Sequence, residues 1–142
     1  MKRYLLIMFI VLALLVGACS TRERSKVLGA DAVPEDIGEL TGTYVVNGFD
    51  PTGIEYGGHL TVTAGNQPGS YQMQWVLAGS ILAGTATLDG NQLLIDWVSV
   101  DQRETPSQGT ALYTITVDGE LYGERFVEGY DNPGTEEAFP NQ

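Results

Sequence analysis

Two residues limit the nucleophilic and metal chemistry of this 142-residue chain: its single cysteine, Cys19, and its single histidine, His59. A Ser-His-Asp or Cys-His site would need His59, which stands beside Gly58 at the start of a predicted strand without a nucleophile elbow or a free cysteine. A tetrahedral zinc site needs further Cys or His ligands, and the chain has none. We therefore expect His59 to lie at the rim of the domain, and we predict no metal site, no cofactor and no enzymatic activity.

Carboxylates are the next candidates for chemistry, and they gather in two glycine-bearing segments, 50–55 and 131–137. Calcium needs only oxygen ligands, but neither segment matches a defined calcium loop. Solvated acidic turns are the preferred interpretation of both. Glycoside hydrolysis would need two carboxylates facing across a cleft, and the sequence offers no preferred pair. An envelope hydrolase is therefore the weakest functional alternative.

Aromatic residues at strand-like spacing raise a third possibility, which is a pocket for a small molecule. The candidate lining residues are Tyr71, Trp75, Trp97 and Tyr113. Small barrels use inward aromatics to hold one ligand, and Gly84 and Ala86 would leave room opposite them. The same alternation of bulky and small residues also fills a narrow barrel, so a packed core is the preferred interpretation and the pocket is the alternative.

The elements that must position these residues are short strands separated by turn signals. Alternating apolar and polar residues predict seven strands, over 40–47, 58–63, 70–78, 81–88, 92–100, 109–117 and 120–127. Most connections are short, so neighbours in the sequence should pair in space. We expect an all-β fold, a single antiparallel meander of about seven to eight strands. A small up-and-down barrel of the lipocalin or avidin kind is favoured over a sandwich.

The N-terminal segment has the layout of an export signal. A basic start at residues 2–3 precedes an unbroken apolar run over 5–16, and two small residues then lead into Cys19. Val16-Gly17-Ala18-Cys19 resembles the lipobox of bacterial lipoproteins. The resemblance implies cleavage after Ala18, linkage of diacylglycerol to Cys19 and often acylation of the new amino group. An uncleaved or ordinary signal peptide is the alternative.

These features divide the chain into four parts. We expect a signal peptide over 1–18, the lipidated cysteine with a flexible tether over 19–38, a barrel-like domain over 39–128 and an irregular acidic tail over 129–142. Two or more acyl chains give persistent membrane binding. The domain would then face the periplasm or the exterior as a monomer, anchored by lipid to the cell membrane or the outer membrane.

The charge of the chain excludes one class of partner. The formal net charge is −11, and removal of the basic residues at 2–3 with the signal peptide would make it −13. Such a surface repels phosphate backbones, so we expect no binding of nucleic acid.

The turn and aromatic pattern also resembles a known group of domains. Gly42-Thr43-Tyr44, the two tryptophans and the segment 118–123 (DGELYG) are similar to small exported bacterial β-domains, of which some are labelled fibronectin-binding and many have no known function. The resemblance covers most of residues 40–128 and implies a fold rather than an activity. This chain departs from the pattern at Arg125, where a further aromatic residue would be expected. We therefore expect a non-catalytic binding or interaction domain at the cell envelope, with a carrier of a small apolar ligand as the alternative.

Overall fold

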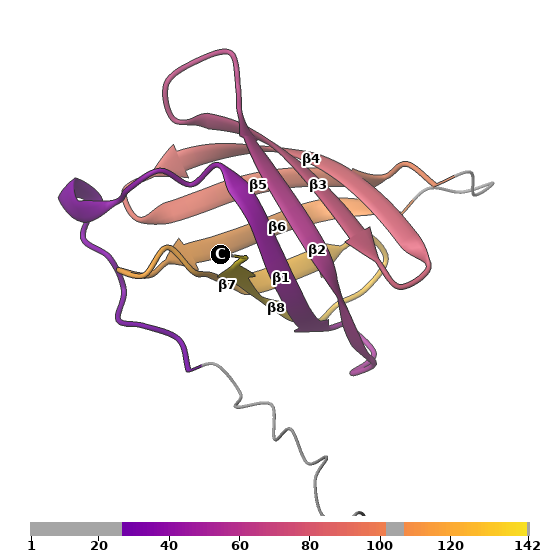
Figure 1. Cartoon of the computed structure of the whole chain (residues 1–142). Helices are drawn as coiled ribbons and strands as arrows, with labels where there is room; N and C mark the ends of the chain where they lie inside the picture. Colours follow the sequence, from indigo (N-terminus) through magenta and orange to yellow (C-terminus); the bar gives the residue numbers. More distant parts are fainter. Residues whose placement is uncertain (1–26, 102–106, 142) are drawn as a thin grey trace, which may run out of the picture.

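A computed structural model describes residues 27–101 and 107–141 (Figure 1). Cys19 and the predicted signal peptide lie outside the described residues. The described elements are the 3-10 turn η1 (Pro34–Asp36) and the strands β1 (Gly42–Phe49), β2 (Glu55–Ala64), β3 (Ser70–Leu77), β4 (Ser80–Asp89), β5 (Gln92–Ser99), β6 (Gln108–Ile115), β7 (Leu121–Val127) and β8 (Gly134–Pro140). None of the described elements is a helix long and apolar enough to cross a membrane.

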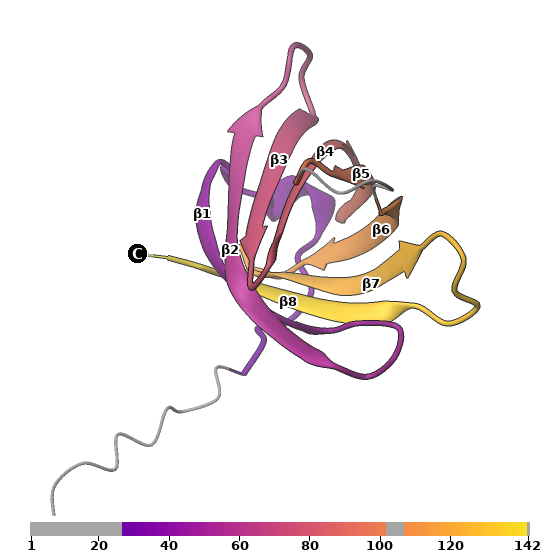
Figure 2. The same ribbon diagram turned by 90° about the vertical axis from the view of Figure 1, so that its right-hand side faces the viewer.

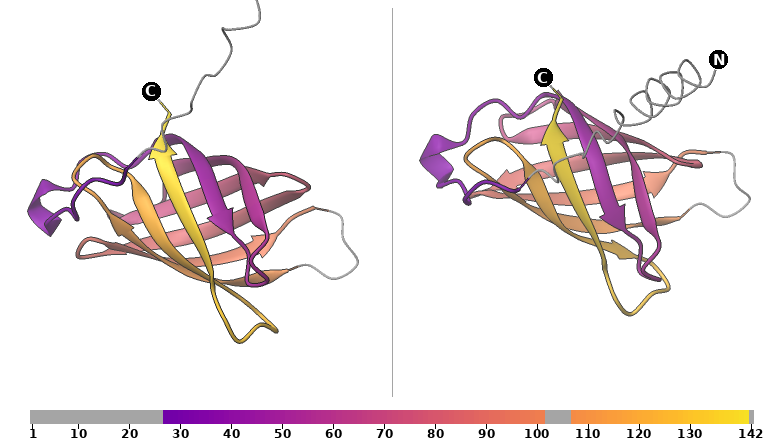
Figure 3. Two further views of the ribbon diagram at one scale, coloured as in Figure 1. Left: turned by 90° about the horizontal axis from the view of Figure 1, so that it is seen from below. Right: turned by 60° about the horizontal axis from the view of Figure 1, so that its bottom comes forward.

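The strands follow one another around a closed barrel. Each strand pairs antiparallel with the next, and β1 also pairs with β8, which completes the ring. β1 and β8 lie side by side in Figure 3, and Figure 2 shows the strands curving around a shared interior. The predicted up-and-down barrel is therefore confirmed. Closure hides the apolar face of every strand without a second sheet.

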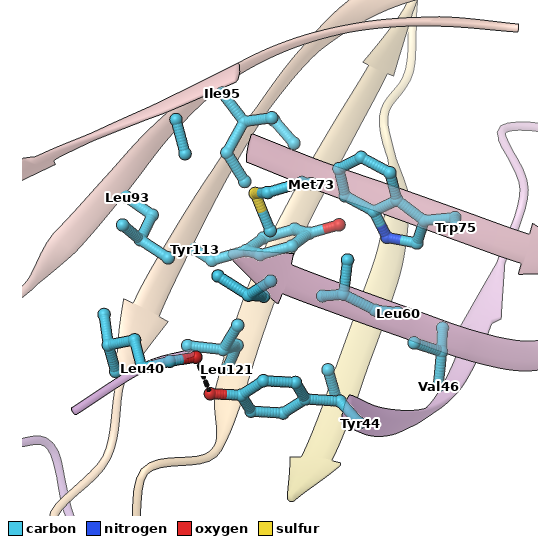
Figure 4. Close-up of a cluster of buried hydrophobic side chains, with 14 of the residues drawn as sticks. Leu40, Tyr44, Val46, Leu60, Met73, Trp75, Leu93, Ile95, Tyr113 and Leu121 are labelled. Atoms are coloured by element: carbon cyan, nitrogen blue, oxygen red, sulfur yellow. Dashed lines mark hydrogen bonds between the residues drawn. The ribbon is translucent and has the colours of Figure 1, made fainter. Parts of the chain in front are cut away.

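Alternation decides which side chains enter the interior. In β3, Met73 and Trp75 are buried while Gln72 and Gln74 are exposed. Figure 4 shows Met73 and Trp75 among other apolar side chains that come from several strands. A Cβ atom on Gly84 would lie 3.2 Å from the ring of Trp75 and 3.3 Å from Cβ of Trp97, so these two tryptophans occupy the room that this glycine leaves.

The prediction of an irregular tail over 129–142 is wrong for its second half, because β8 (Gly134–Pro140) completes the barrel. Its inward residues are Gly134, Glu136 and Ala138, which are buried, whereas Thr135 and Glu137 are exposed. None of the three inward residues is large and apolar, so the strand carries little of the hydrophobic alternation by which the other strands were predicted.

The prediction of a flexible tether up to residue 38 is also wrong for its described part. The amide of Ala32 donates to the carbonyl of Ile115 at 2.9 Å, and that of Val117 donates to the carbonyl of Ala30 at 2.8 Å. On the side of the N-terminal segment these bonds use only the backbone groups of Ala30 and Ala32. Backbone hydrogen bonds of small residues produce no recognisable pattern in the sequence. In Figure 1 this indigo segment crosses the end of the barrel where the β4–β5 and β6–β7 hairpins turn. We call this end the closed end.

Leu40 completes the closed end from the inside. Its side chain is buried, and its carbonyl accepts a hydrogen bond from the hydroxyl of Tyr44 at 2.7 Å (Figure 4). The β1–β2, β3–β4, β5–β6 and β7–β8 connections lie at the opposite end of the barrel, which we call the open end.

Candidate functional site

The interior contains a carboxylate, Glu136, that is only 2% exposed. Its Oε1 accepts hydrogen bonds from Nε1 of Trp75 at 2.8 Å and from the hydroxyl of Tyr113 at 2.5 Å. Its Oε2 accepts from the hydroxyl of Tyr56 at 2.7 Å and from Nη1 of Arg125 at 2.8 Å. Four donors therefore compensate for the loss of water around this buried charge.

Arg125 is the positive partner of this carboxylate and is itself only 5% exposed. Its guanidinium carbon lies 4.7 Å from the ring centroid of Trp97 and 5.3 Å from that of Trp75, within the range of cation–π attraction. Burial is the largest influence on Arg125 and lowers its pKa, but the charge of Glu136, the hydrogen bond to it and the neighbouring Tyr113 and Tyr56 together outweigh burial and hold the pKa of Arg125 above its usual value. The guanidinium therefore stays charged, and the pair as a whole is neutral.

The tyrosines stay protonated for a related reason. Burial, followed by the negative charge of Glu136, raises the pKa of Tyr113 well above its usual value. The same two causes raise the pKa of Tyr56. Both hydroxyls are therefore donors to the carboxylate at physiological pH.

Glycines on the neighbouring strands make room for this cluster. Glu136 lies between Gly48 of β1 and Gly123 of β7 in the strand register. A Cβ atom on Gly48 would come within 2.6 Å of the Tyr56 ring, so a larger residue there would push the ring away from the carboxylate. The polar cluster thus depends on small residues beside the strand that carries its acid.

A cavity of about 450 Å³ opens at the open end of the barrel. Its lining includes residues from all four connections at that end, together with inward residues of the strands. Arg125, Trp97 and Tyr56 contribute polar and aromatic surface, and the apolar surface includes Leu77, Leu82 and Val127. Glu136 does not line the cavity, whereas Arg125 and Tyr56, which both donate to its Oε2, do.

The first acidic segment, 50–55, forms part of the rim of this cavity and is stabilised by hydrogen bonds to Asp50. Oδ1 of Asp50 accepts hydrogen bonds from the amide and the hydroxyl of Thr52, at 2.8 and 2.6 Å, and from the amide of Ile54 at 2.9 Å. The bond from the Thr52 hydroxyl is the largest cause of a lowered pKa for Asp50. Asp50 therefore stabilises the turn as an acceptor, in agreement with the expectation of an acidic turn.

The second acidic segment, 131–137, was predicted to be a solvated turn. That prediction is wrong for Glu136, which lies in β8 and points into the barrel. Within the described ranges, no three His, Cys, Asp or Glu side chains are grouped so that they could hold a metal ion.

The structure distributes the four predicted pocket residues over different parts of the barrel. Trp97 lines the cavity. Trp75 and Tyr113 lie beneath the cavity, where both donate hydrogen bonds to Glu136. Tyr71 is partly buried in the half of the barrel near the closed end, on the same side as Tyr44, and does not line the cavity.

Sequence reasoning missed Tyr56 and Glu136 and recorded Arg125 only as a departure from a pattern. The composition nevertheless contained an indication of the ion pair between Arg125 and Glu136. Arg103 and Arg125 are the only basic residues after residue 39 apart from His59, and Arg125 stands inside a predicted strand. A cation at an inward strand position needs a buried partner, and that need points to an inward acid on another strand.

Fold and site together define a closed eight-stranded antiparallel barrel with a cavity at one end and a buried ion pair beneath it. No family model and no curated protein matches the chain. Solved structures of designed barrels are similar in fold. EF1p2_mFAP2b bound to DFHBI has a TM-score of 0.57 and 15% identity, and the match covers 72% of this chain and 94% of the designed one.

Two further designed barrels give the same result. The redesigned barrel mFAP1 bound to DFHBI has a TM-score of 0.59 and 12% identity, with 77% of this chain and 98% of the other covered. A de novo designed fluorescence-activating barrel has a TM-score of 0.52 and 13% identity, with 72% of this chain and 93% of the other covered. At these identities the similarity shows the fold alone.

Proposed function

We propose that this protein is a lipid-anchored binding protein of the cell envelope, without catalytic activity, whose barrel takes a small molecule into its open end. The observation that carries the proposal is the cavity of about 450 Å³ at that end. Its size lies within the range of about 300–1,000 Å³ that is usual for small-molecule sites. Its lining combines apolar side chains with polar ones such as Arg125, and convergent polar groups that orient a ligand are also typical of such sites.

The polar cluster supports binding rather than catalysis. A general base needs a carboxylate that can reach a substrate proton. Glu136 already accepts four hydrogen bonds and does not line the cavity. The designed barrels with a similar fold are described as bound to DFHBI, which supports the capacity of this architecture to hold a small molecule.

The envelope location is supported by the sequence alone. The lipobox-like Val16-Gly17-Ala18-Cys19 follows a basic and apolar leader, which is the arrangement of a lipidated export signal. Anchoring would keep the binding domain close to the membrane surface, where a carrier can collect a ligand without being lost from the cell.

Native mass spectrometry of the full-length protein, extracted from the membranes of an exporting bacterium, tests the ligand. We expect an additional mass that is released by mild activation. Leu77→Trp should abolish it, because Leu77 lines the cavity and the larger side chain occupies its space. Leu94→Trp is the matched control, because Leu94 is 47% exposed on the outside of the barrel.

The absence of a releasable additional mass, beyond that of the lipidated chain, in the unmodified protein and both variants would contradict a small-molecule function. The outer surface would then be the part of the molecule that binds, and the protein would be an interaction domain.

A further inference from the structure

We infer that the ligand is a small planar apolar monoanion, such as an aromatic carboxylate, with its acid group on Arg125 and its ring against Trp97. This inference rests on the proposed small-molecule function and adds the chemical class of the ligand. It follows from the unused donors of Arg125, the fixed face of Trp97 and the charges around the cavity.

Arg125 has donors to spare on its cavity side. A guanidinium carries five N–H donors in a planar fork. In the described part of the chain, the hydrogen bonds of Arg125 come from Nη1, to Glu136 at 2.8 Å and to Tyr56 at 3.5 Å. Because Arg125 lines the cavity and Glu136 does not, a ligand oxygen can approach the guanidinium from the side away from the carboxylate. Arginine binds carboxylates well because its fork can make two parallel bonds.

Trp97 offers an aromatic surface beside this cation. Its Nε1 donates to the carbonyl of Thr110 at 3.1 Å, which fixes the orientation of the indole. Gly109 allows this position, because a Cβ atom there would lie 3.1 Å from the ring. Trp97 and Arg125 both line the cavity, with the guanidinium carbon 4.7 Å from the ring centroid. The guanidinium already lies over this ring, so a planar ligand would contact the part of the indole that lines the cavity while it places an oxygen on the guanidinium.

The surrounding charges favour one negative charge on the ligand rather than two. Arg125 is already neutralised in part by Glu136, and the cavity is also lined by Asp50 and Glu55. A second negative charge would meet these carboxylates and the overall net charge of −11. The long-range repulsion is screened by salt, whereas the buried contact with Arg125 is screened much less. The affinity for a monoanion should therefore not fall as salt is added.

The test compares three probes of nearly equal shape on the unmodified full-length protein in nanodiscs: 2-naphthoate, 2-naphthamide and 2-naphthalenemethanol. Binding is followed by tryptophan fluorescence and by calorimetry at pH 7. We expect naphthoate to bind at least about tenfold more tightly than either neutral probe, as a charge-assisted hydrogen bond would give. We also expect its affinity to hold or increase between low and physiological salt.

The double variant Arg125→Met with Glu136→Gln removes both charges of the pair. It should bind the three probes equally, and circular dichroism establishes that it is folded. Discrimination that persists in the folded double variant would overturn the assignment to Arg125. Since the probe comparison uses the unmodified protein, the inference remains testable if this variant does not fold.

The two levels of the proposal fail in different ways. Equal binding of the acid and the neutral probes overturns the anionic ligand class and leaves the cavity as a small-molecule site. Binding of none of the probes, together with the absence of a releasable additional mass on the protein from the exporting bacterium, overturns the proposed function itself.

Discussion

Glu136 is the residue on which four other strands converge, because its donors come from β2, β3, β6 and β7. Glu136→Leu would leave a buried guanidinium without its counter-charge, and breaking a buried pair in this way costs about 3–5 kcal/mol. Glu136→Gln keeps an acceptor oxygen and should cost less. The free energy of unfolding, measured in urea at pH 7, checks both values.

Glu137→Gln is the matched control for this prediction. Glu137 is the next residue of β8 and is exposed, so its change should stay within about 0.5 kcal/mol. If Glu136→Leu unfolded at the same urea concentration as the unmodified protein, the four hydrogen bonds would contribute nothing to stability.

Tyr44 makes stability depend on pH in the alkaline range. Burial, with smaller effects of Tyr71 and Glu39, raises the pKa of Tyr44 to about 12. The unfolded chain ionises near pH 10 and the folded chain does not, so stability is lost as pH rises from 10 to 12, by up to about 1.4 kcal/mol per pH unit. Tyr44→Phe removes this dependence along with the bond to Leu40.

The comparison of Tyr44→Phe with the unmodified protein is therefore made at several pH values. At pH 8 the variant should be less stable by about 1 kcal/mol, because one hydrogen bond is lost. The difference should shrink above pH 10 and then reverse. A difference that stays constant from pH 8 to pH 12 would show that Tyr44 ionises equally in both states.

At the level of single residues, the sequence indicates chemistry less well than it indicates burial. Trp75 and Tyr113 were predicted to face inward, and they do. Their partner Glu136 was not predicted, because an acid in a segment with Gly, Pro and other acids is usually solvated. Only the three-dimensional register, which sets Glu136 beside two glycines, reveals the space in which it can be buried.

Among the elements, the N-terminal segment is the part whose contribution is easiest to isolate. Leu40 is 1% exposed and lies at the closed end, so Leu40→Ala should cost about 2–5 kcal/mol through lost burial and the cavity that remains. Leu94→Ala, at an exposed position of β5, should change stability far less. Thermal unfolding of the two variants provides the comparison.

An equal effect of the two substitutions would show that the N-terminal segment covers the barrel without stabilising it. The hydrogen bonds of Ala30 and Ala32 with the strand ends predict the opposite.

The strands differ in how clearly the sequence marks them. Seven were predicted within a few residues of their observed ends, because alternation and turn glycines coincide in each. The β7–β8 connection and β8 were missed together, since Gly134, Glu136 and Ala138 give the inward face of β8 no apolar period. Closure of the barrel was nevertheless predictable, because a meander with one apolar face must close or fold over.

On the scale of the whole molecule, the two ends of the barrel differ in structure. The N-terminal segment joins the barrel at the closed end, and the cavity opens at the other. The eight residue steps from Cys19 to Val27 span at most about 30 Å when fully extended. If Cys19 carries the lipid, the closed end is held near the membrane, and the net charge of −13 that remains after removal of the signal peptide repels the rest from anionic lipids.

We therefore predict that the mouth of the cavity faces away from the bilayer. Asp89→Cys at the closed end and Asp131→Cys at the open end are both exposed positions for a fluorophore. In vesicles with nitroxide-labelled head groups, the probe at position 89 should be quenched more strongly than the probe at position 131. The same labels in a Cys19→Ala background should not be quenched at all, because the protein would leave the membrane. Equal quenching at both positions would mean that the barrel lies on its side, and a Cys19→Ala protein that stayed in the membrane would contradict the lipid anchor.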